Sequence, residues 1–170
     1  MSPSESSPLR IGILTVSDAG SRGERVDASG QILVEWCLDE GHSLVGKETV
    51  PDQTERIVPI LLRWADGGDV DLIFTTGGTG FGPRDVTPEA TRAVLDRASP
   101  GLSEAIRRRG EEKTPYAPLS RGLAGTRGSV FIVNLPGSPG GVRDGLAVLG
   151  PLADHVVGLL RAWDTPHRQS

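Results

Sequence analysis

The stretch DLIFTTGGTGFGPRDVTP spans residues 71–88 and joins an apolar segment to a glycine-rich one. Its first part is apolar and rich in β-branched residues, which predicts a buried strand. Four glycines follow the strand within six positions: Gly77, Gly78, Gly80 and Gly82. Glycine loses more backbone freedom on folding than any other residue, so such a cluster is costly to order. We therefore expect a loop that needs bare backbone, either for tight turns or for the close approach of a ligand.

Short apolar stretches alternate with segments of helical periodicity on both sides of this loop. Strands are expected at residues 9–16, 43–50, 70–76 and 130–135. Helices are expected at about residues 27–40, 52–66, 87–97, 99–112, 138–149 and 151–163. Strands that alternate with helices are joined by right-handed crossovers. The sequence therefore predicts a three-layer α/β fold, with a mostly parallel sheet and helices on both faces.

Several of the expected helices begin at typical capping residues. Thr87 precedes a proline and an acid, which predicts that it caps the helix after the glycine loop. Asp52 with Glu55 three residues later resembles a capping box. Pro59 lies inside the helix that would follow Asp52, where it conflicts with helix propensity, and Pro151 marks the start of the final helix.

The composition of the chain indicates a folded, single-domain protein. The chain has 170 residues, of which 36% are hydrophobic and 24% charged, with a net charge of −4. These values fit a single domain over residues 1–170, with a core at about 9–163 and short polar tails, and they argue against disorder and against a nucleic-acid partner. The only cysteine, Cys37, lies in an apolar stretch, where a buried thiol is expected.

Neither the N-terminal segment MSPSESSPLR nor any apolar run has the features of a secretion signal or a membrane span. We therefore expect a cytoplasmic protein without a membrane partner. The histidines His42, His155 and His167 show no metal-ligand spacing and are expected to be structural or solvated.

A second glycine-rich turn, PGSPGG at residues 136–141, also follows a strand and precedes a helix. In a parallel sheet both loops would lie at the carboxyl ends of strands, where ligands bind and where helix N-termini favour anions. The alternative is that the glycines only make turns. GGTGFG continues with Pro83 and Arg84, so it matches neither a P-loop nor a dinucleotide fingerprint. Asp85 could hold Mg²⁺ against phosphate oxygens beside the cation Arg84, which favours phosphoryl or nucleotidyl transfer.

Five motifs occur in the order of a known family: TVSD at 15–18, TTGGTGFGPRDVTPEAT at 75–91, PGL at 100–102, LSR at 119–121 and NLPGSP at 134–139. On these motifs the chain resembles the molybdopterin adenylyltransferases of the MogA/MoaB family, to which the G domain of gephyrin also belongs. The resemblance covers about residues 9–163 and implies the molybdopterin-binding fold.

The resemblance also implies an activity, in which Mg²⁺ and ATP adenylylate the terminal phosphate of molybdopterin and pyrophosphate is released. It implies catalytic roles for Asp52, Asp85 and Ser120, with Asp52 and Asp85 holding Mg²⁺. Ser120 and Arg121 would contact the pterin phosphate or the transfer centre. ATP or the adenylylated product would lie against Gly77, Gly78, Thr79, Gly80, Arg84, Pro136, Gly137, Ser138, Pro139, Gly140 and Gly141. A homotrimer, or a hexamer of paired trimers, and a molybdenum-insertion enzyme as partner are implied in the same way.

Two other functions remain open at this point. The chain could be a non-catalytic molybdopterin-binding or scaffold relative, although the intact Pro83-Arg84-Asp85 segment argues against lost turnover. It could also be a nucleotide pyrophosphate hydrolase, although the related domains typically carry a leucine in place of Thr79 and two adjacent acids. Asp52 could be only a helix cap, Asp85 only a turn acid, and Ser120 with Arg121 only a loop contact.

Overall fold

A computed structural model describes residues 7–163. Residues 1–6 and 164–170, which belong to the expected polar tails and include His167, lie outside the described residues. Six strands form one sheet in the order β2-β1-β3-β6-β5-β4. The strands are β1 (Arg10–Val16), β2 (Ser43–Val50), β3 (Leu72–Thr76), β4 (Arg97–Ala98), β5 (Ala124–Arg127) and β6 (Val130–Leu135). The four strands β2, β1, β3 and β6 are parallel neighbours, whereas β5 and β4 add an antiparallel edge. The predicted α/β fold with a mostly parallel sheet is confirmed.

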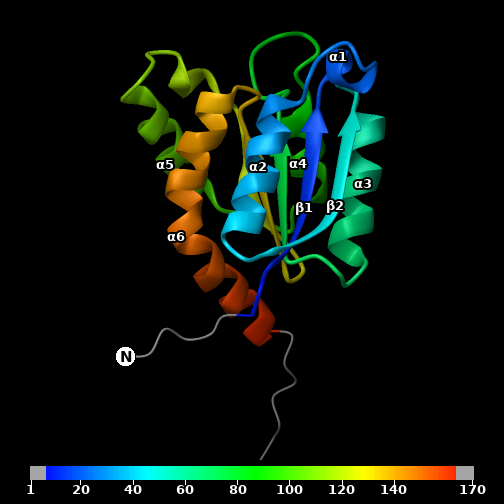
Figure 1. Cartoon of the computed structure of the whole chain (residues 1–170), viewed down its shortest axis with the longest axis vertical. Coiled ribbons are helices and arrows are strands. Elements are labelled where there is room, and N and C mark those ends of the chain that lie inside the picture. Colours follow the sequence, from blue (N-terminus) through cyan, green and yellow to red (C-terminus); the bar gives the residue numbers. More distant parts are fainter. Residues whose placement is uncertain (1–6, 164–170) are drawn as a thin grey trace, which may run out of the picture.

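Helices cover both faces of this sheet (Figure 1). They are α1 (Asp18–Ser21), α2 (Ala28–Asp39), α3 (Thr54–Asp66), α4 (Thr87–Val94), α5 (Pro100–Glu111) and α6 (Pro139–Trp163), with a 3₁₀ turn at Ala117–Leu119. One apolar cluster joins α2, α5 and α6 to one face, and a second joins α3 and α4 to the other. The two clusters use alternate residues of β6: Phe131 and Val133 belong to the first, Ile132 to the second.

The last helical segment differs from the prediction, because α6 is one continuous helix of 25 residues with Pro151 inside it. A proline removes one backbone hydrogen bond and crowds the preceding turn. Here a buried apolar stripe runs past the proline at helical spacing: Val142, Leu146, Leu149, Ala153 and Val157. Burial of this stripe against the core outweighs the local loss. Pro59 is likewise accommodated inside α3.

Helix α4 is shorter than predicted, because it ends at Val94 and the chain turns extended at Leu95. The next residues form β4, which pairs with β5, and neither of these strands was predicted. Both are short, and β5 reads AGTR, which lacks the apolar alternation of a typical strand.

Two predicted helix caps are also wrong. Gln53 rather than Asp52 is the N-cap of α3, and no side-chain bond caps this helix. Val86 rather than Thr87 is the N-cap of α4, while the Thr87 hydroxyl donates to the carbonyl of Gly77 at 2.9 Å. The side chains of Asp52 and Thr87 therefore bond to the loops at the carboxyl end of the sheet instead of capping helices. By contrast, Asp27 does cap α2, because its side chain accepts a 2.9 Å bond from the Gly30 amide.

Among the described residues, α6 is also the one helix whose length and composition would allow it to cross a membrane, with a window of mean hydropathy 1.3. It packs against α2, α5 and β6, which is the ordinary position of a core helix. Cys37 is buried as predicted, and burial raises the pKa of its thiol. The His42 Nδ1 atom accepts a hydrogen bond from the Leu9 amide, a structural contact.

The amino end of the sheet is closed by an ion-pair cluster. Asp71 precedes β3 and has only 4% of its side-chain surface exposed. It accepts hydrogen bonds from the Arg10 amide at 2.8 Å, from the Arg10 guanidinium at 3.1 Å, and from Arg161 of α6 at 2.7 Å. Burial alone would raise the pKa of Asp71, but the two arginines lower it to about 2. The cluster ties the end of α6 to β1 and β3.

Candidate functional site

The glycine loop after β3 contains two kinds of glycine. Gly77 and Gly78 have φ of 98° and 68°, which favours glycine strongly. A Cβ at Gly77 would lie 2.2 Å from the carbonyl oxygen of Val16, and one at Gly78 would lie 2.3 Å from the Thr87 hydroxyl. At Gly80 and Gly82 a Cβ would meet only the Asp85 carboxylate, at 2.9 Å. Gly77 and Gly78 therefore make the turn, whereas Gly80 and Gly82 leave room for the carboxylate of Asp85.

This loop is held in place from several directions. The Gly77 amide donates to the Leu135 carbonyl at 3.1 Å, and the Arg121 amide donates to the Thr79 carbonyl at 2.8 Å. The Arg121 guanidinium donates to the carbonyls of Gly80 at 2.8 Å and Asp85 at 2.9 Å, and it forms an ion pair with Glu89. The Arg121 side chain therefore holds the glycine loop by bonding to the backbone carbonyls of that loop. The sequence analysis did not predict this role.

A first cavity of about 330 Å³ opens at the carboxyl ends of β1, β2 and β3. It brings together six residues that the sequence analysis named: Asp52, Gly77, Gly78, Asp85, Gly137 and Pro139. Its other side is formed by the start of α2, where the Ser29 hydroxyl donates to the Gly137 carbonyl at 2.8 Å. Both glycine loops lie at the carboxyl end of the sheet, as predicted, and the structure shows that they meet at one cavity.

Two carboxylates, Asp52 and Asp85, line this cavity, and a third, Asp18, is hydrogen-bonded to Asp52. The Asp18 amide donates to Asp52 Oδ2 at 2.9 Å, and the Asp52 amide donates to Asp18 Oδ1 at 3.0 Å. Arg84 donates two hydrogen bonds to Asp18, at 3.0 and 2.9 Å, and lowers the pKa of its carboxyl. Asp85 accepts a bond from the Gly82 amide at 2.9 Å. Arg84, expected at the ligand, is thus the partner of Asp18 in this structure.

Asp52 has the opposite electrostatic environment to Asp18. Burial raises the pKa of Asp52, and the charges of Asp18 and Asp85 raise it further, against the hydrogen bond from the Asp18 amide. The positive charge of Arg84, which pairs with Asp18, only partly offsets these effects. A cation in the first cavity would therefore be favoured by the charge of Asp52 and Asp85.

The donor set also decides which metal would fit. In the described residues no three or more His, Cys, Asp or Glu side chains are arranged to hold a metal ion. Mg²⁺ is usually held by one or two carboxylates, with phosphate oxygens and water completing its octahedron. Asp52 and Asp85 on the wall of one cavity fit that pattern, provided that a polyphosphate supplies further oxygens.

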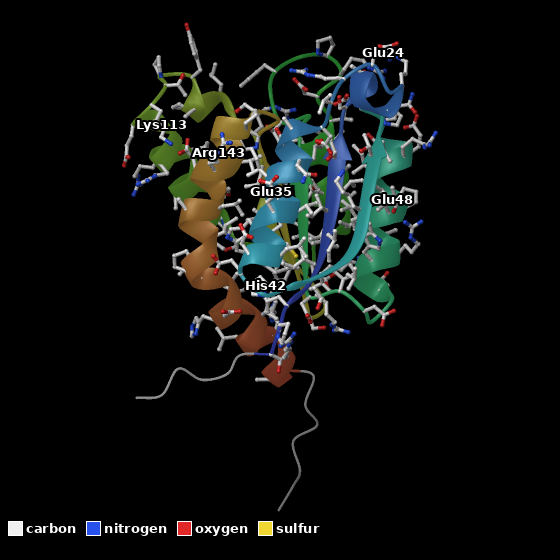
Figure 2. The ribbon with its side chains drawn as sticks, in the orientation of Figure 1. Glu24, Glu35, His42, Glu48, Lys113 and Arg143 are labelled. Carbon is white, nitrogen blue, oxygen red and sulfur yellow. The ribbon has the colours of Figure 1, made fainter. Side chains whose placement is uncertain are left out.

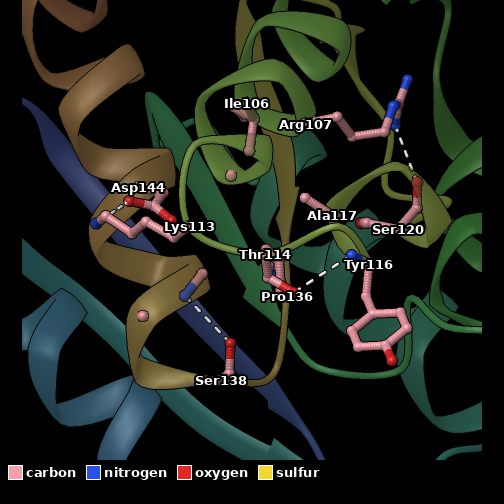
Figure 3. A pocket seen from close by; sticks show the side chains of 13 residues that line it. Ile106, Arg107, Lys113, Thr114, Tyr116, Ala117, Ser120, Pro136, Ser138 and Asp144 are labelled. Carbon is pink, nitrogen blue, oxygen red and sulfur yellow. Dashed lines mark hydrogen bonds and ion pairs between the residues drawn. The ribbon is translucent and has the colours of Figure 1, made fainter.

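A second cavity of about 330 Å³ lies on the other side of the Pro136–Gly141 turn (Figure 3). It contains five residues that the sequence analysis named: Ser120, Pro136, Ser138, Gly140 and Gly141. The rest of its wall comes from α5, the segment after it and α6, including Arg107, Lys113 and Asp144. Figure 2 places Lys113 at the same end of the molecule as Glu24, far from His42 at the amino end. The turn is the wall that both cavities share.

Four residues of the expected site line neither cavity. Arg84 pairs with Asp18, and Arg121 holds the glycine loop. Thr79 is buried, and Gly80 contacts Asp85 rather than either cavity. Conversely, Lys113 and Asp144 line the second cavity and Asp18 bonds to Asp52, although none of the three was predicted as a site residue. Asp18 stands in the TVSD motif, and Asp144 follows Gly141 at helical spacing, so each carried a signal.

Comparison with known proteins identifies the family. A family model described as "Probable molybdopterin binding domain" matches residues 12–155. The molybdopterin adenylyltransferase of Helicobacter pylori is 38% identical over 158 residues, covering 89% of this chain and 88% of that protein. The Drosophila melanogaster molybdenum cofactor synthesis protein cinnamon is 40% identical over 153 residues, but the chain spans only 26% of its length.

The fold agrees with this assignment. The crystal structure of the molybdopterin biosynthesis enzyme MoaB from Thermus thermophilus superimposes with a TM-score of 0.83 at 49% sequence identity. The match covers 91% of this chain and 97% of that one. The resemblance inferred from the five motifs is confirmed, and the chain belongs to the family of molybdopterin binding domains.

Proposed function

We propose that this chain is an enzyme of molybdenum cofactor biosynthesis, a molybdopterin adenylyltransferase. A phosphate oxygen of molybdopterin attacks the α-phosphorus of ATP, the bond between the α-phosphorus and its bridging oxygen breaks, and pyrophosphate leaves. The Helicobacter pylori relative of that name supports the reaction. The observation that carries the proposal is the pair of cavities on opposite sides of the Pro136–Gly141 turn. Asp52 and Asp85 line the first cavity, and Ser120 lines the second.

The first cavity suits the nucleotide and its metal. Backbone amides at a glycine turn can approach phosphate oxygens closely, because no side chain stands in the way. Asp52 and Asp85 would hold Mg²⁺, which neutralises charge on the triphosphate when it is bound. Such a site works by positioning and by electrostatic stabilisation, and it needs no nucleophilic side chain.

The second cavity suits the pterin. Ser120 and Ser138 lie on its wall, so a hydroxyl is available beside the shared turn where a terminal phosphate would meet the α-phosphorus. Arg121 would act on the substrates indirectly, because it positions the glycine loop through the carbonyls of Gly80 and Asp85. Arg84 is held by Asp18 until a competing anion arrives. These roles extend the proposal to the individual residues.

The proposal includes four further features, of which the first two rest on the composition and apolar patterning of the sequence and the last two on the resemblance. They are a single domain over the whole chain, a cytoplasmic location, a homotrimer that can pair into a hexamer, and a molybdenum-insertion enzyme that receives the product. A non-catalytic scaffold would bind both ligands without turnover, and a pyrophosphate hydrolase would split a nucleotide without a pterin.

One assay separates these functions. Purified protein is incubated with ATP, Mg²⁺ and molybdopterin, and the products are resolved by mass spectrometry. We expect adenylylated molybdopterin and pyrophosphate in equal amounts, and neither product when Mg²⁺ is chelated. Binding of both ligands without product would indicate the scaffold, whereas AMP formation without pterin would indicate the hydrolase. Asp85→Asn serves as a site variant that retains a side chain of the same size.

A further inference from the structure

Asp144 is an unusual group in the second cavity. It lies on α6 with only 8% of its side-chain surface exposed, and it lines the cavity. Its one partner in the described structure is Lys113, whose Nζ atom pairs with Oδ1 and whose side chain is 58% exposed. A buried carboxylate normally satisfies both of its oxygens, because an unsatisfied one is costly.

The second oxygen of Asp144 is open to the cavity. None of the described buried side-chain oxygens is both shielded from solvent and without a partner. Oδ2 of Asp144 has no hydrogen-bond partner in the described residues, so it must be reached by solvent. Figure 3 shows one oxygen paired with Lys113 and the other directed away from it. The cavity therefore presents a free carboxylate acceptor beside a lysine ammonium.

This pair of charges matches one edge of a pterin ring. The 2-amino-4-oxopyrimidine part of a pterin presents a 2-amino group and an N3–H, which are donors, followed by the O4 acceptor. A carboxylate only accepts hydrogen bonds and an ammonium only donates them. We propose that Asp144 accepts hydrogen bonds from the 2-amino edge of the bound pterin, with Lys113 placed to donate to O4. The inference rests on the proposed function for the identity of the ring.

The carboxylate of Asp144 would also select against the adenine of ATP, the other substrate. Adenine has no N–H beside its amino group, only a ring nitrogen that accepts, so it would set an acceptor against the carboxylate. A site built to bond a donor rejects an analogue that lacks it, because its buried polar group is left unpaired. Asp144 thereby directs the pterin to the second cavity and leaves the first for ATP.

The cavity also has the room that this placement needs. Its volume of about 330 Å³ lies at the lower end of small-molecule sites, which run from about 300 to 1,000 Å³. Gly140 lies on its wall, and a Cβ there would have no atom within 4 Å. The glycine therefore leaves the wall open beside the helix that carries Asp144.

A pair of fluorescent probes tests Asp144 directly. We use 6-carboxypterin and 6-carboxylumazine, which differ in that the lumazine has an oxygen in place of the 2-amino group. The unmodified protein is expected to bind the pterin about 10-fold more tightly or better, the size of a hydrogen bond to a charged group. Asp144→Asn is expected to bring the two affinities within about twofold, and Asp144→Glu to retain a preference for the pterin.

Controls separate recognition from folding. Asp154→Asn, at an exposed position of the same helix, is expected to keep the pterin preference. Thermal unfolding of each variant shows whether loss of the Lys113 pair destabilises the fold, and a purely structural Asp144 would change that temperature without changing the ratio of affinities. Equal binding of the two probes by the unmodified protein would overturn the inference without the need for any variant.

The adenylylation assay keeps the two proposals distinguishable. If turnover with molybdopterin occurs but Asp144→Asn leaves the affinity ratio unchanged, the inference is wrong and the proposed function stands. If the ratio depends on Asp144 but no adenylylated product forms, the proposed reaction is wrong and the pterin subsite stands.

Discussion

The two ends of the sheet use the same side chain in opposite ways. At the amino end Asp71 lies between Arg10 and Arg161, which lower its pKa to about 2. At the carboxyl end burial raises the pKa of Asp52, and two further carboxylates, Asp18 and Asp85, add to the shift. An aspartate that is neutralised by its own chain stabilises the fold, whereas one whose negative charge is only partly offset, here by Arg84, is suited to bind a cation.

The largest effect is expected at the carboxyl end. Asp52→Asn should lower the rate of adenylyl transfer about 10²- to 10³-fold, the usual loss when one electrostatic contact at a transition state is removed. The melting temperature should not fall, because an acid whose folded pKa is raised costs stability when it is ionised at neutral pH. Turnover at saturating Mg²⁺ and ATP, together with thermal unfolding, measures both effects.

The control for this variant is Asp154→Asn, an exposed acid on α6 that should leave rate and stability unchanged. A normal rate in Asp52→Asn would remove Asp52 from the mechanism. A large drop in melting temperature would instead mean that its bond from the Asp18 amide is chiefly structural.

The second effect belongs to the amino end. Asp71→Asn should lower the free energy of unfolding by about 2 kcal/mol at pH 7, because the pKa falls from 3.8 to about 2 and each unit is worth about 1.4 kcal/mol. Urea unfolding measures this loss. The rate of adenylyl transfer per folded molecule should stay the same, and a parallel loss of rate would show that the two ends are not independent.

The pH dependence of stability should follow from the same aspartate. The folded pKa of Asp71 is lower than its unfolded value of 3.8, so its contribution is fully present above pH 3.8. It should be lost as the pH falls through about 2. Unfolding free energies measured between pH 5 and 2 should therefore fall more steeply for the unmodified protein than for Asp71→Asn. Identical curves would contradict the assignment of this titration to Asp71.

The smallest effect is expected for Ser120, which lies in the second cavity without a charge. Ser120→Ala should slow single-turnover formation of the adenylylated pterin by about 2- to 10-fold, the range of one neutral hydrogen bond. The affinity for the pterin should fall by less. Ser43→Ala, an exposed serine at the start of β2, provides the control. A collapse of affinity with a normal rate at saturation would make Ser120 a binding residue only.

Much of the fold could be predicted because the decisive signals are local. Each parallel strand is a short apolar run, and each glycine loop directly follows one of them, so both loops had to lie at the carboxyl edge. The antiparallel edge could not be predicted in this way. Strand β4 has two residues, and its pairing with β5 depends on contacts that form only after the chain has folded.

The site was predicted less completely, since sequence motifs do not show the direction of a side chain. Asp52 fits a helix cap by its spacing, yet its carboxylate turns to the Asp18 amide. Arg121 looked like a ligand contact but holds loop carbonyls. Pro151 looked like a helix start, although the buried positions at 142, 146, 149, 153 and 157 continue past it. That periodicity was present in the sequence and would have corrected the prediction.

The position of the chain ends affects how this domain can be combined with others. Strand β1 begins, and α6 ends, at the amino end of the sheet, while both cavities lie at the carboxyl end (Figure 1). The described chain therefore enters at β1 and leaves at α6 on the side of the sheet away from both cavities. Domains with neighbouring ends are readily inserted into longer chains. This arrangement is compatible with a place in a longer chain, and the Drosophila relative is such a chain, since this one spans only 26% of its length.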